Sequence, residues 1–143
     1  MAVTTRDNMD VVRRDVEEIW NGDDTDAIPD LVAEDFVYHN PMVDEEIRGP
    51  EGYRHLIEEY REAVPDFEMT VEEMFGDGDR VATRFTTRGT VEGELRGVEA
   101  TGKRIEVTGA IVDHIEDGKI AERWVHDDAL GMMKQLGAIP EDR

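Results

Sequence analysis

The stretch KRIEVTGAIVDHIEDGKIAERWVHDD, residues 103–128, decides the fold because it contains two strand-like segments joined by a tight turn. Apolar and polar residues alternate from Lys103 to Ile115 and again from Lys119 to Asp128, a period that is typical of β-strands. Glu116-Asp117-Gly118 separates the two segments, and an Asp-Gly pair is a strong signal for a hairpin turn. We therefore predict that the chain closes with an antiparallel hairpin.

Two more strands precede this hairpin, and helices precede the strands. Residues 67–73 and 81–87 also alternate, on either side of a turn at 76–79. Helical spacing of apolar residues predicts three earlier helices, over residues 5–20, 24–32 and 49–64. Helices followed by antiparallel strands indicate an α+β domain with the helices packed on one face of the sheet.

The composition indicates one domain, residues 1–143, and excludes several kinds of partner. There are 36 acidic and 16 basic residues, spread along the chain, with a formal net charge of −20. Salt at about 1 M shortens the Debye length to ~3 Å and screens such repulsion, so we expect a protein of a high-salt cytoplasm. No basic stripe could bind nucleic-acid phosphates. No apolar run reaches the ~20 residues that span a membrane, and there is no cysteine for a disulfide, thiolate or Cys-based zinc site.

Three side chains of the last strand are candidates for a functional surface. Alternate residues of a strand share a face, so Trp124, His126 and Asp128 point the same way. If that face is the concave one, the Asp128 carboxyl group could exchange protons with a bound substrate. The alternative is that Asp128 caps the short helix that follows it.

The position of His114 depends on the register of the hairpin. A two-residue turn pairs Ile115 with Ile120 and puts His114 on the face opposite to Trp124. A three-residue turn pairs His114 with Ile120 and puts it on the same face as Trp124 and His126. The Asp-Gly pair fits both turns, so the residues alone leave both open.

A second group of candidates lies at the end of a short strand predicted over residues 36–40. Tyr38, His39 and Asn40 could reach into the mouth of a pocket, or they could form only a turn, since Asn-Pro is common in turns. A metal site built from His126 and Asp128 with His39 and His114 is a further alternative. Because such pairs arise often by chance in strands, we predict no metal.

These segments resemble the SnoaL-like polyketide cyclases, an ester cyclase family of the nuclear-transport-factor-2-like superfamily. The closing stretch from Glu116 to Trp124, followed by Asp128 and Gln135-Leu136-Gly137, is similar to the end of those enzymes. The stretch Tyr38-His39-Asn40-Pro41 and the helix start Gly49-Pro50-Glu51-Gly52-Tyr53 resemble them as well. The resemblance covers nearly the whole chain.

The resemblance implies a cone-shaped α+β barrel, with three N-terminal helices packed on a strongly curved antiparallel sheet around an apolar cavity. In the cyclases of this family an aspartate of the last strand is the general acid/base of an aldol ring closure, and it falls on Asp128. The assisting histidines fall on His126 and His114, which favours the three-residue turn. Trp124 and Tyr53 would shape the pocket.

We therefore expect an enzyme that transfers protons next to a carbonyl, as an aldol-type cyclase, isomerase or hydratase, and that needs no cofactor. Its ligand would be small, apolar and carbonyl-containing. Two rival hypotheses are a non-catalytic binding module with the same pocket and an assembly domain whose sheet face forms a homo-oligomer. A dimer or tetramer fits all three hypotheses, because the outer sheet face carries Val and Ile side chains as well as charges.

Overall fold

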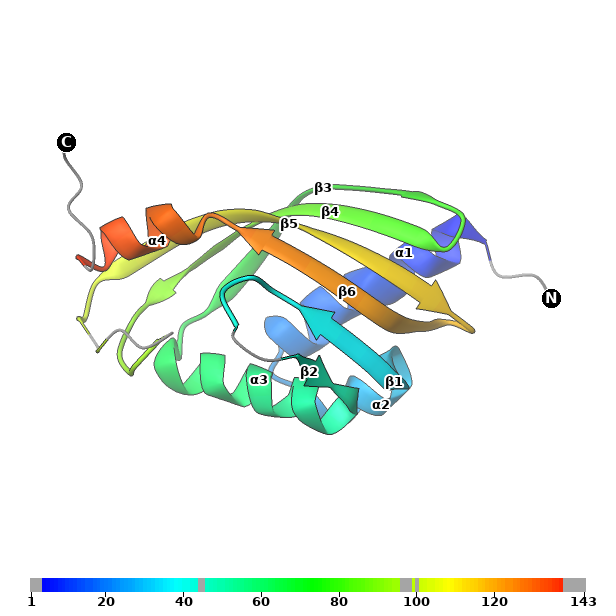
Figure 1. The fold of residues 1–143 in the computed structure, drawn as a ribbon, viewed down its shortest axis with the longest axis horizontal. Coiled ribbons are helices and arrows are strands. Elements are labelled where there is room, and N and C mark those ends of the chain that lie inside the picture. The colour runs from blue at the N-terminus through cyan, green and yellow to red at the C-terminus, as the bar shows by residue number, and fades with distance from the viewer. Residues whose placement is uncertain (1–3, 44–45, 96–98, 100, 138–143) are drawn as a thin grey trace.

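A curved sheet arches over a layer of helices in the computed structural model, which describes residues 4–43, 46–95, 99 and 101–137 (Figure 1). The helical elements are α1 (Thr5–Arg14), a π-helical continuation (Asp15–Trp20), a 3₁₀ turn (Thr25–Ala27), α2 (Ile28–Leu31), α3 (Gly49–Ala63) and α4 (Ala129–Gln135). The strands are β1 (Val32–His39), β2 (Ile47–Arg48), β3 (Glu68–Asp77), β4 (Arg80–Thr90), β5 (Arg104–Glu116) and β6 (Lys119–Asp127). The predicted α+β class is confirmed.

The six strands form one open sheet in the order β2-β1-β6-β5-β4-β3. All neighbours run antiparallel except β1 and β6, which are parallel, so the sheet is mixed. A parallel pair needs a long crossover, and here α3 and four strands separate β1 from β6 in the chain. Figure 1 shows α1 and α3 beneath the sheet and α4 at its end, next to β5.

The hairpin between β5 and β6 has a two-residue turn. Asp117 and Gly118 have φ angles of 51° and 79°, and Ile115 pairs with Ile120. Positive φ at both central residues is the geometry of a type I′ turn. The three-residue turn that the family resemblance favours is therefore wrong. A β-bulge follows at once, however, and it pairs His114 with Glu122.

The core lies between the helices and the concave face of the sheet. Thr4 begins α1 with a capping box, in which the Thr4 hydroxyl accepts from Asp7 N (3.0 Å) and Asp7 Oδ2 accepts from Thr4 N (3.1 Å). This cap directs the apolar stripe of α1 toward the sheet. Fully buried side chains from both layers meet there, among them Val12, Ile19, Phe36, Ile57, Val81 and Ile120.

Candidate functional site

A small cavity remains inside this core, between the helices and the concave face of the sheet. Its volume is about 50 Å³, and it is partly open to the surface; below it is called the enclosed cavity because it lies within the core. Five aromatic rings form much of its wall, those of Trp20, Tyr38, Tyr60, Phe67 and Phe85. Polar groups also face it, from Tyr38, Thr87, Arg123 and Asp127. An apolar cavity with a few polar groups is the usual form of a small-molecule site.

Asp127 reaches this cavity because it lies on the inward face of β6. Burial alternates along the end of the strand, and Arg123, Val125 and Asp127 all line the cavity. The Oδ1 atom of Asp127 is buried, and the residue also borders an adjoining void of about 20 Å³. Asp127 pairs with Gly109 of β5, where a Cβ atom would lie 2.6 Å from Phe85 Cζ and 2.9 Å from Asp127 Cα. The glycine therefore leaves the space that the Phe85 ring and Asp127 occupy.

Arg123 is held at its place in the cavity wall by a buried ionic network. Its Nε donates to Asp113 Oδ1 (2.6 Å) and its Nη2 to Asp113 Oδ2 (3.1 Å). Its Nη1 donates to Asp15 Oδ2 (2.9 Å) and to the Tyr53 hydroxyl (2.8 Å). That hydroxyl donates to Asp15 Oδ1 (2.7 Å) and accepts from Trp20 Nε1 (2.8 Å). The network thus joins the helical layer to β5 and β6.

The charges of this network follow from burial and from the arrangement of the ions. Burial raises the pKa of Asp113, whereas the nearby Arg123 guanidinium lowers it. Burial alone would lower the pKa of Arg123, but Asp113 and Asp15 raise it well above its usual value, so Arg123 keeps its charge. Burial also raises the pKa of Tyr53 well above its usual value, so its hydroxyl stays a donor.

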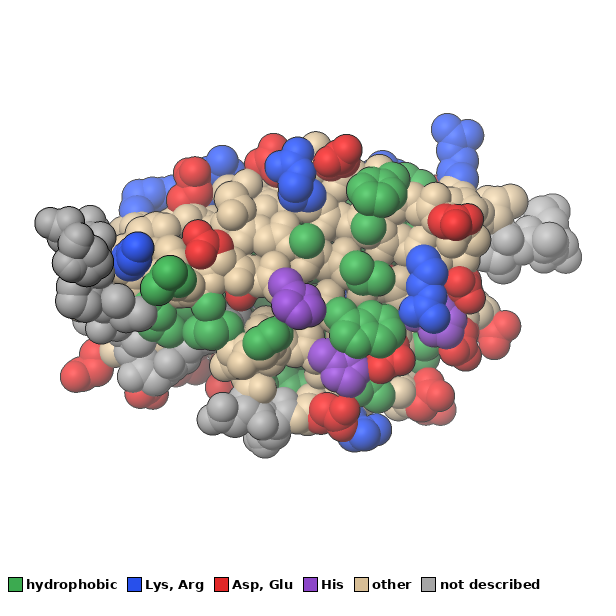
Figure 2. Space-filling view, turned by 45° about the horizontal axis from the view of Figure 1, so that its top comes forward, with side chains coloured by type: hydrophobic (Ala, Val, Ile, Leu, Met, Phe, Trp, Pro, Cys, Tyr) green, Lys and Arg blue, Asp and Glu red, His purple; other side chains and the backbone are tan. Residues whose placement is uncertain are grey.

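The predicted residues Trp124, His126 and His114 share a face, and it is the outer one. Figure 2 shows histidine side chains next to hydrophobic ones on the surface of the molecule. His126 is exposed, and Trp124 stacks on His39 with ring centroids 5.5 Å apart. His39 Nε2 lies 2.6 Å from Glu122 Oε2, and His114 Nε2 lies 3.1 Å from Asp79 Oδ2. None of these side chains lines the enclosed cavity. The bulge in β6 brings His114 to this face despite the two-residue turn.

The structure places Asp128 at the start of α4, as its N-cap. Its Oδ1 accepts a hydrogen bond from Gly131 N (2.9 Å), and its side chain is exposed. A Cβ atom at position 131 would lie 2.1 Å from Asp128 Oδ2, so Gly131 leaves room for the cap. The helix-capping alternative for Asp128 matches this geometry.

The other predicted pocket residues lie at three different depths. Tyr38 lines the cavity, whereas Tyr53 is buried in the ionic network behind it. Asn40 is buried; its Oδ1 accepts from Met42 N (2.9 Å) and its Nδ2 donates to the Tyr38 hydroxyl (3.2 Å). Asn40 therefore builds a turn that also supports a cavity residue.

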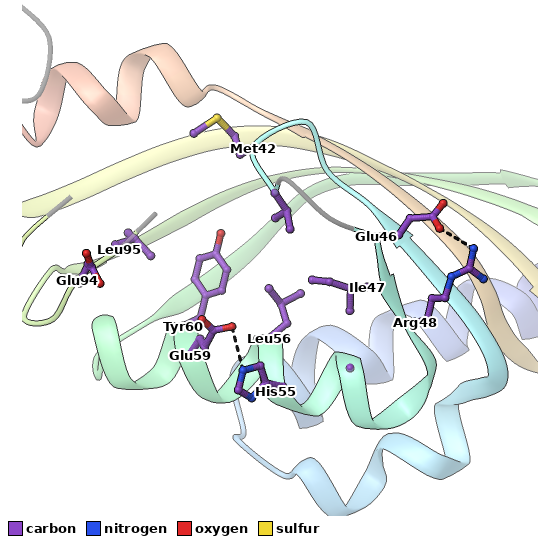
Figure 3. Close-up of a pocket in the computed structure, with 12 residues that line it drawn as sticks. Met42, Glu46, Ile47, Arg48, His55, Leu56, Glu59, Tyr60, Glu94 and Leu95 are labelled. Carbon is purple, nitrogen blue, oxygen red and sulfur yellow. Dashed lines mark hydrogen bonds and ion pairs between the residues drawn. The ribbon is translucent and has the colours of Figure 1, made fainter. Parts of the chain in front are cut away.

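An open groove of about 540 Å³ lies outside the enclosed cavity, between α3 and the chain before it (Figure 3). Its floor is apolar, with Val43, Ile47, Leu56 and Leu95, and its rim carries charged side chains. Tyr60 of α3 borders both the groove and the enclosed cavity.

Within the described part of the chain, no group of three or more His, Asp or Glu side chains is arranged to hold a metal ion. Over the same residues, no helix has the length and apolar character that a membrane crossing requires.

Comparisons with known proteins point to one family. The sequence profile of the SnoaL-like polyketide cyclases matches residues 10–136. The aklanonic acid methyl ester cyclase DauD of Streptomyces sp. (strain C5) is 31% identical over 136 residues, which cover 90% of this chain and 81% of that protein.

Solved structures agree with these sequence matches. TsrD from Streptomyces laurentii has a TM-score of 0.85 at 28% identity, over 96% of this chain and 100% of that one. IdmH from Streptomyces antibioticus has a TM-score of 0.79 at 32% identity, over 91% of this chain and 98% of that one.

Proposed function

Since the chain belongs to the SnoaL-like polyketide cyclase family, we propose that it is an enzyme that closes a ring by an aldol-type reaction, with Asp127 as the general acid/base. One observation carries the assignment of Asp127: it is the carboxylate that reaches the enclosed cavity from the last strand. The ligand would be a small apolar molecule with a carbonyl group, because the cavity is mainly aromatic and aliphatic.

In the proposed step, the Asp127 carboxylate removes a proton from the carbon next to a carbonyl group of the ligand. The enolate attacks the carbon of a second carbonyl group, a carbon–carbon bond forms, and the new alkoxide takes a proton back. The reaction moves protons and one electron pair within the ligand, so its redox state does not change. A positioned carboxyl group contributes to such a step by general acid–base catalysis.

Arg123 supplies positive charge at the other end of the same strand face. Its four hydrogen bonds to Asp113, Asp15 and Tyr53 use four of the five guanidinium N–H groups. We assign the fifth, on Nη2, to the ligand oxygen on which negative charge develops. Strand geometry separates the Cα atoms of Arg123 and Asp127 by roughly 13 Å, so a ligand would extend between them.

The assignment of the acid/base to Asp128, with His114 and His126 assisting, stays a competing prediction. Those side chains would have to reach the ligand from outside the enclosed cavity, and one experiment separates the two assignments. Asp127→Asn is expected to lower kcat/KM by about 10²–10⁴-fold. Asp128→Asn should change it only a few-fold, since asparagine is also a good N-cap.

The assay uses aklanonic acid methyl ester, the compound in the name of the relative DauD, and follows ring closure by chromatography. Thermal melts of both variants control for loss of fold. A large loss in Asp128→Asn with normal activity in Asp127→Asn would transfer the role to Asp128.

A homo-oligomer is a second proposal, and it rests on the outer face of the sheet. Strand register places Phe75, Ala82, Val112 and Trp124 in one row across β3 to β6. Phe75 is 60% exposed and Val112 is 43% exposed, which is unusual for large apolar side chains that form one row. We propose that a second copy of this chain covers the row.

Val112→Glu should convert the oligomer to a monomer, because it would bury a carboxylate at the centre of the contact. Light scattering coupled to size-exclusion chromatography measures the mass, in about 1 M salt to screen repulsion between acidic chains. Leu130→Glu is the control, since Leu130 is 54% exposed but lies on α4. A wild-type protein that is monomeric at that salt concentration would refute the proposal.

A further inference from the structure

Tyr60 lies between the small cavity in the core and the open groove, which is about ten times larger. It also borders the adjoining void. Two edge-to-face contacts hold its ring, with Trp20 (centroids 5.6 Å apart) and with Phe67 (6.0 Å). Figure 3 shows its ring rising from α3, with the hydroxyl end toward the sheet. Tyr60 is thus a partition between the interior and the groove.

The interior alone is too small for a ring-bearing ligand. The cavity and the void enclose about 50 Å³ and about 20 Å³. An engineered cavity that binds benzene has about 150 Å³. The groove, at about 540 Å³, is within the range of about 300–1,000 Å³ found for ligand pockets. A ligand with its reacting end in the cavity therefore needs more space, and the groove beyond Tyr60 provides it.

The side chains of the groove disfavour an anionic moiety. Arg48 Nη2 lies 2.6 Å from Glu46 Oε1, so this cation is already paired, and Glu59 and Glu94 add negative charge. An anionic ligand therefore gains little there, and the floor of the groove is apolar. This surface fits an uncharged ring system, which gains by burial alone.

We propose that Tyr60 is a specificity-determining residue that divides one ligand site into an inner and an outer subsite. The inner subsite takes the carbonyl end, beside Asp127 and Arg123, and the groove takes the uncharged rings. The inference rests on the proposed function in one respect, that the carbonyl end enters the cavity. Tyr60 has to move aside for ligands that carry a ring.

Two probes with the same acetyl group and different sizes test this division: acetone, which has no ring, and 2-acetylanthracene, which has three. The chain has two tryptophans, and Trp20 lines the cavity whereas Trp124 lies on the outer face. In a Trp124→Phe background, quenching of tryptophan fluorescence therefore reports entry into the inner subsite.

Tyr60→Ala is expected to tighten 2-acetylanthracene binding by about tenfold, because the long probe no longer displaces a ring held by two aromatic contacts. Acetone binding should change less than about threefold, and Tyr60→Phe, which keeps the ring, should not tighten 2-acetylanthracene binding. Ile47→Trp, which fills the groove, should weaken 2-acetylanthracene binding by about tenfold and leave acetone binding unchanged.

Three results would overturn the proposal. They are an equal gain for both probes in Tyr60→Ala, unchanged 2-acetylanthracene binding in Ile47→Trp, and no quenching by either probe in any variant. The assay of Asp127→Asn uses turnover rather than binding. Failure of the proposed function can therefore be told apart from failure of the two-subsite inference.

Discussion

Arg123→Met is expected to lower the free energy of unfolding by about 3–5 kcal/mol, because it leaves two buried carboxylates without a cation. Asp15 and Asp113 are both 0% exposed, and both accept hydrogen bonds from Arg123. A domain typically unfolds at a cost of about 5–15 kcal/mol, so the variant would keep a small part of its stability. Urea denaturation measures the loss, and Tm should fall by about 10 °C or more.

Asp113→Asn is the matched control for this prediction. Two carboxylates face one guanidinium, so removal of one charge leaves Arg123 paired with Asp15 at 2.9 Å. The expected loss is about 1–3 kcal/mol, from imperfect hydrogen bonds rather than from an unpaired ion. Equal losses of unfolding free energy in Arg123→Met and Asp113→Asn would show that the number of unpaired buried charges does not determine the destabilisation.

The pH dependence of Arg123→Met gives a second readout. In the native protein burial raises the pKa of Asp113 and Arg123 lowers it. In Arg123→Met the guanidinium is absent, and burial and the nearby Asp15 still raise the pKa of Asp113. A carboxyl group whose pKa is higher in the folded than in the unfolded state binds its proton more tightly when the protein is folded, and this stabilises the fold at low pH. The contribution is complete below the unfolded pKa of about 3.9, and it is lost as the pH rises through the folded pKa. The difference in unfolding free energy between Arg123→Met and the wild type should therefore become smaller as the pH falls.

The order and type of the elements could be predicted because they depend on local patterns. Apolar spacing predicted a helix over residues 5–20, and α1 with its π-helical continuation covers that range. Gly49-Pro50 marked the start of α3, and Asp117-Gly118 marked the β5–β6 turn. Each of these signals lies within a few residues of the feature that it predicts.

Which residues of β6 face the cavity could not be predicted, because alternation does not tell which face of a sheet is concave. Trp124 and His126 share a face, as alternation requires, and that face is the outer one. A shift of one residue, from Asp128 to Asp127, leads from a helix cap to the cavity wall. The apolar Val125, two residues before Asp127, was the available signal for the inward face.

The ionic network was missed for a different reason, which is sequence distance. Asp15 and Arg123 are 108 residues apart, and no local pattern pairs them. Asp15 lies in the amphipathic first helix, where a charged residue is expected to face solvent, yet it is fully buried. Its spacing, three residues after Val12 and four before Ile19, places it on the buried stripe of this helix.

Replacing the whole network tests whether its charges serve the fold or the chemistry. Asp15→Asn, Asp113→Leu and Arg123→Met together remove every buried charge, and asparagine at position 15 keeps an acceptor for the Tyr53 hydroxyl. Apolar replacement of a buried ion network is often neutral or stabilising by about 1–4 kcal/mol. We expect the unfolding free energy to stay within about 2 kcal/mol of the wild type, well above that of Arg123→Met alone.

Activity should not survive the same replacement. The triple variant lacks the guanidinium N–H that we assign to the developing oxyanion, and loss of one such donor costs about 10²–10³-fold in kcat. Denaturation curves and turnover of aklanonic acid methyl ester, measured on the same preparation, separate the two roles. A stable, inactive triple variant means that the buried charges are kept for catalysis. A stable, active one would remove Arg123 from the mechanism, and an unfolded one would mean that the charges hold the helical layer on the sheet.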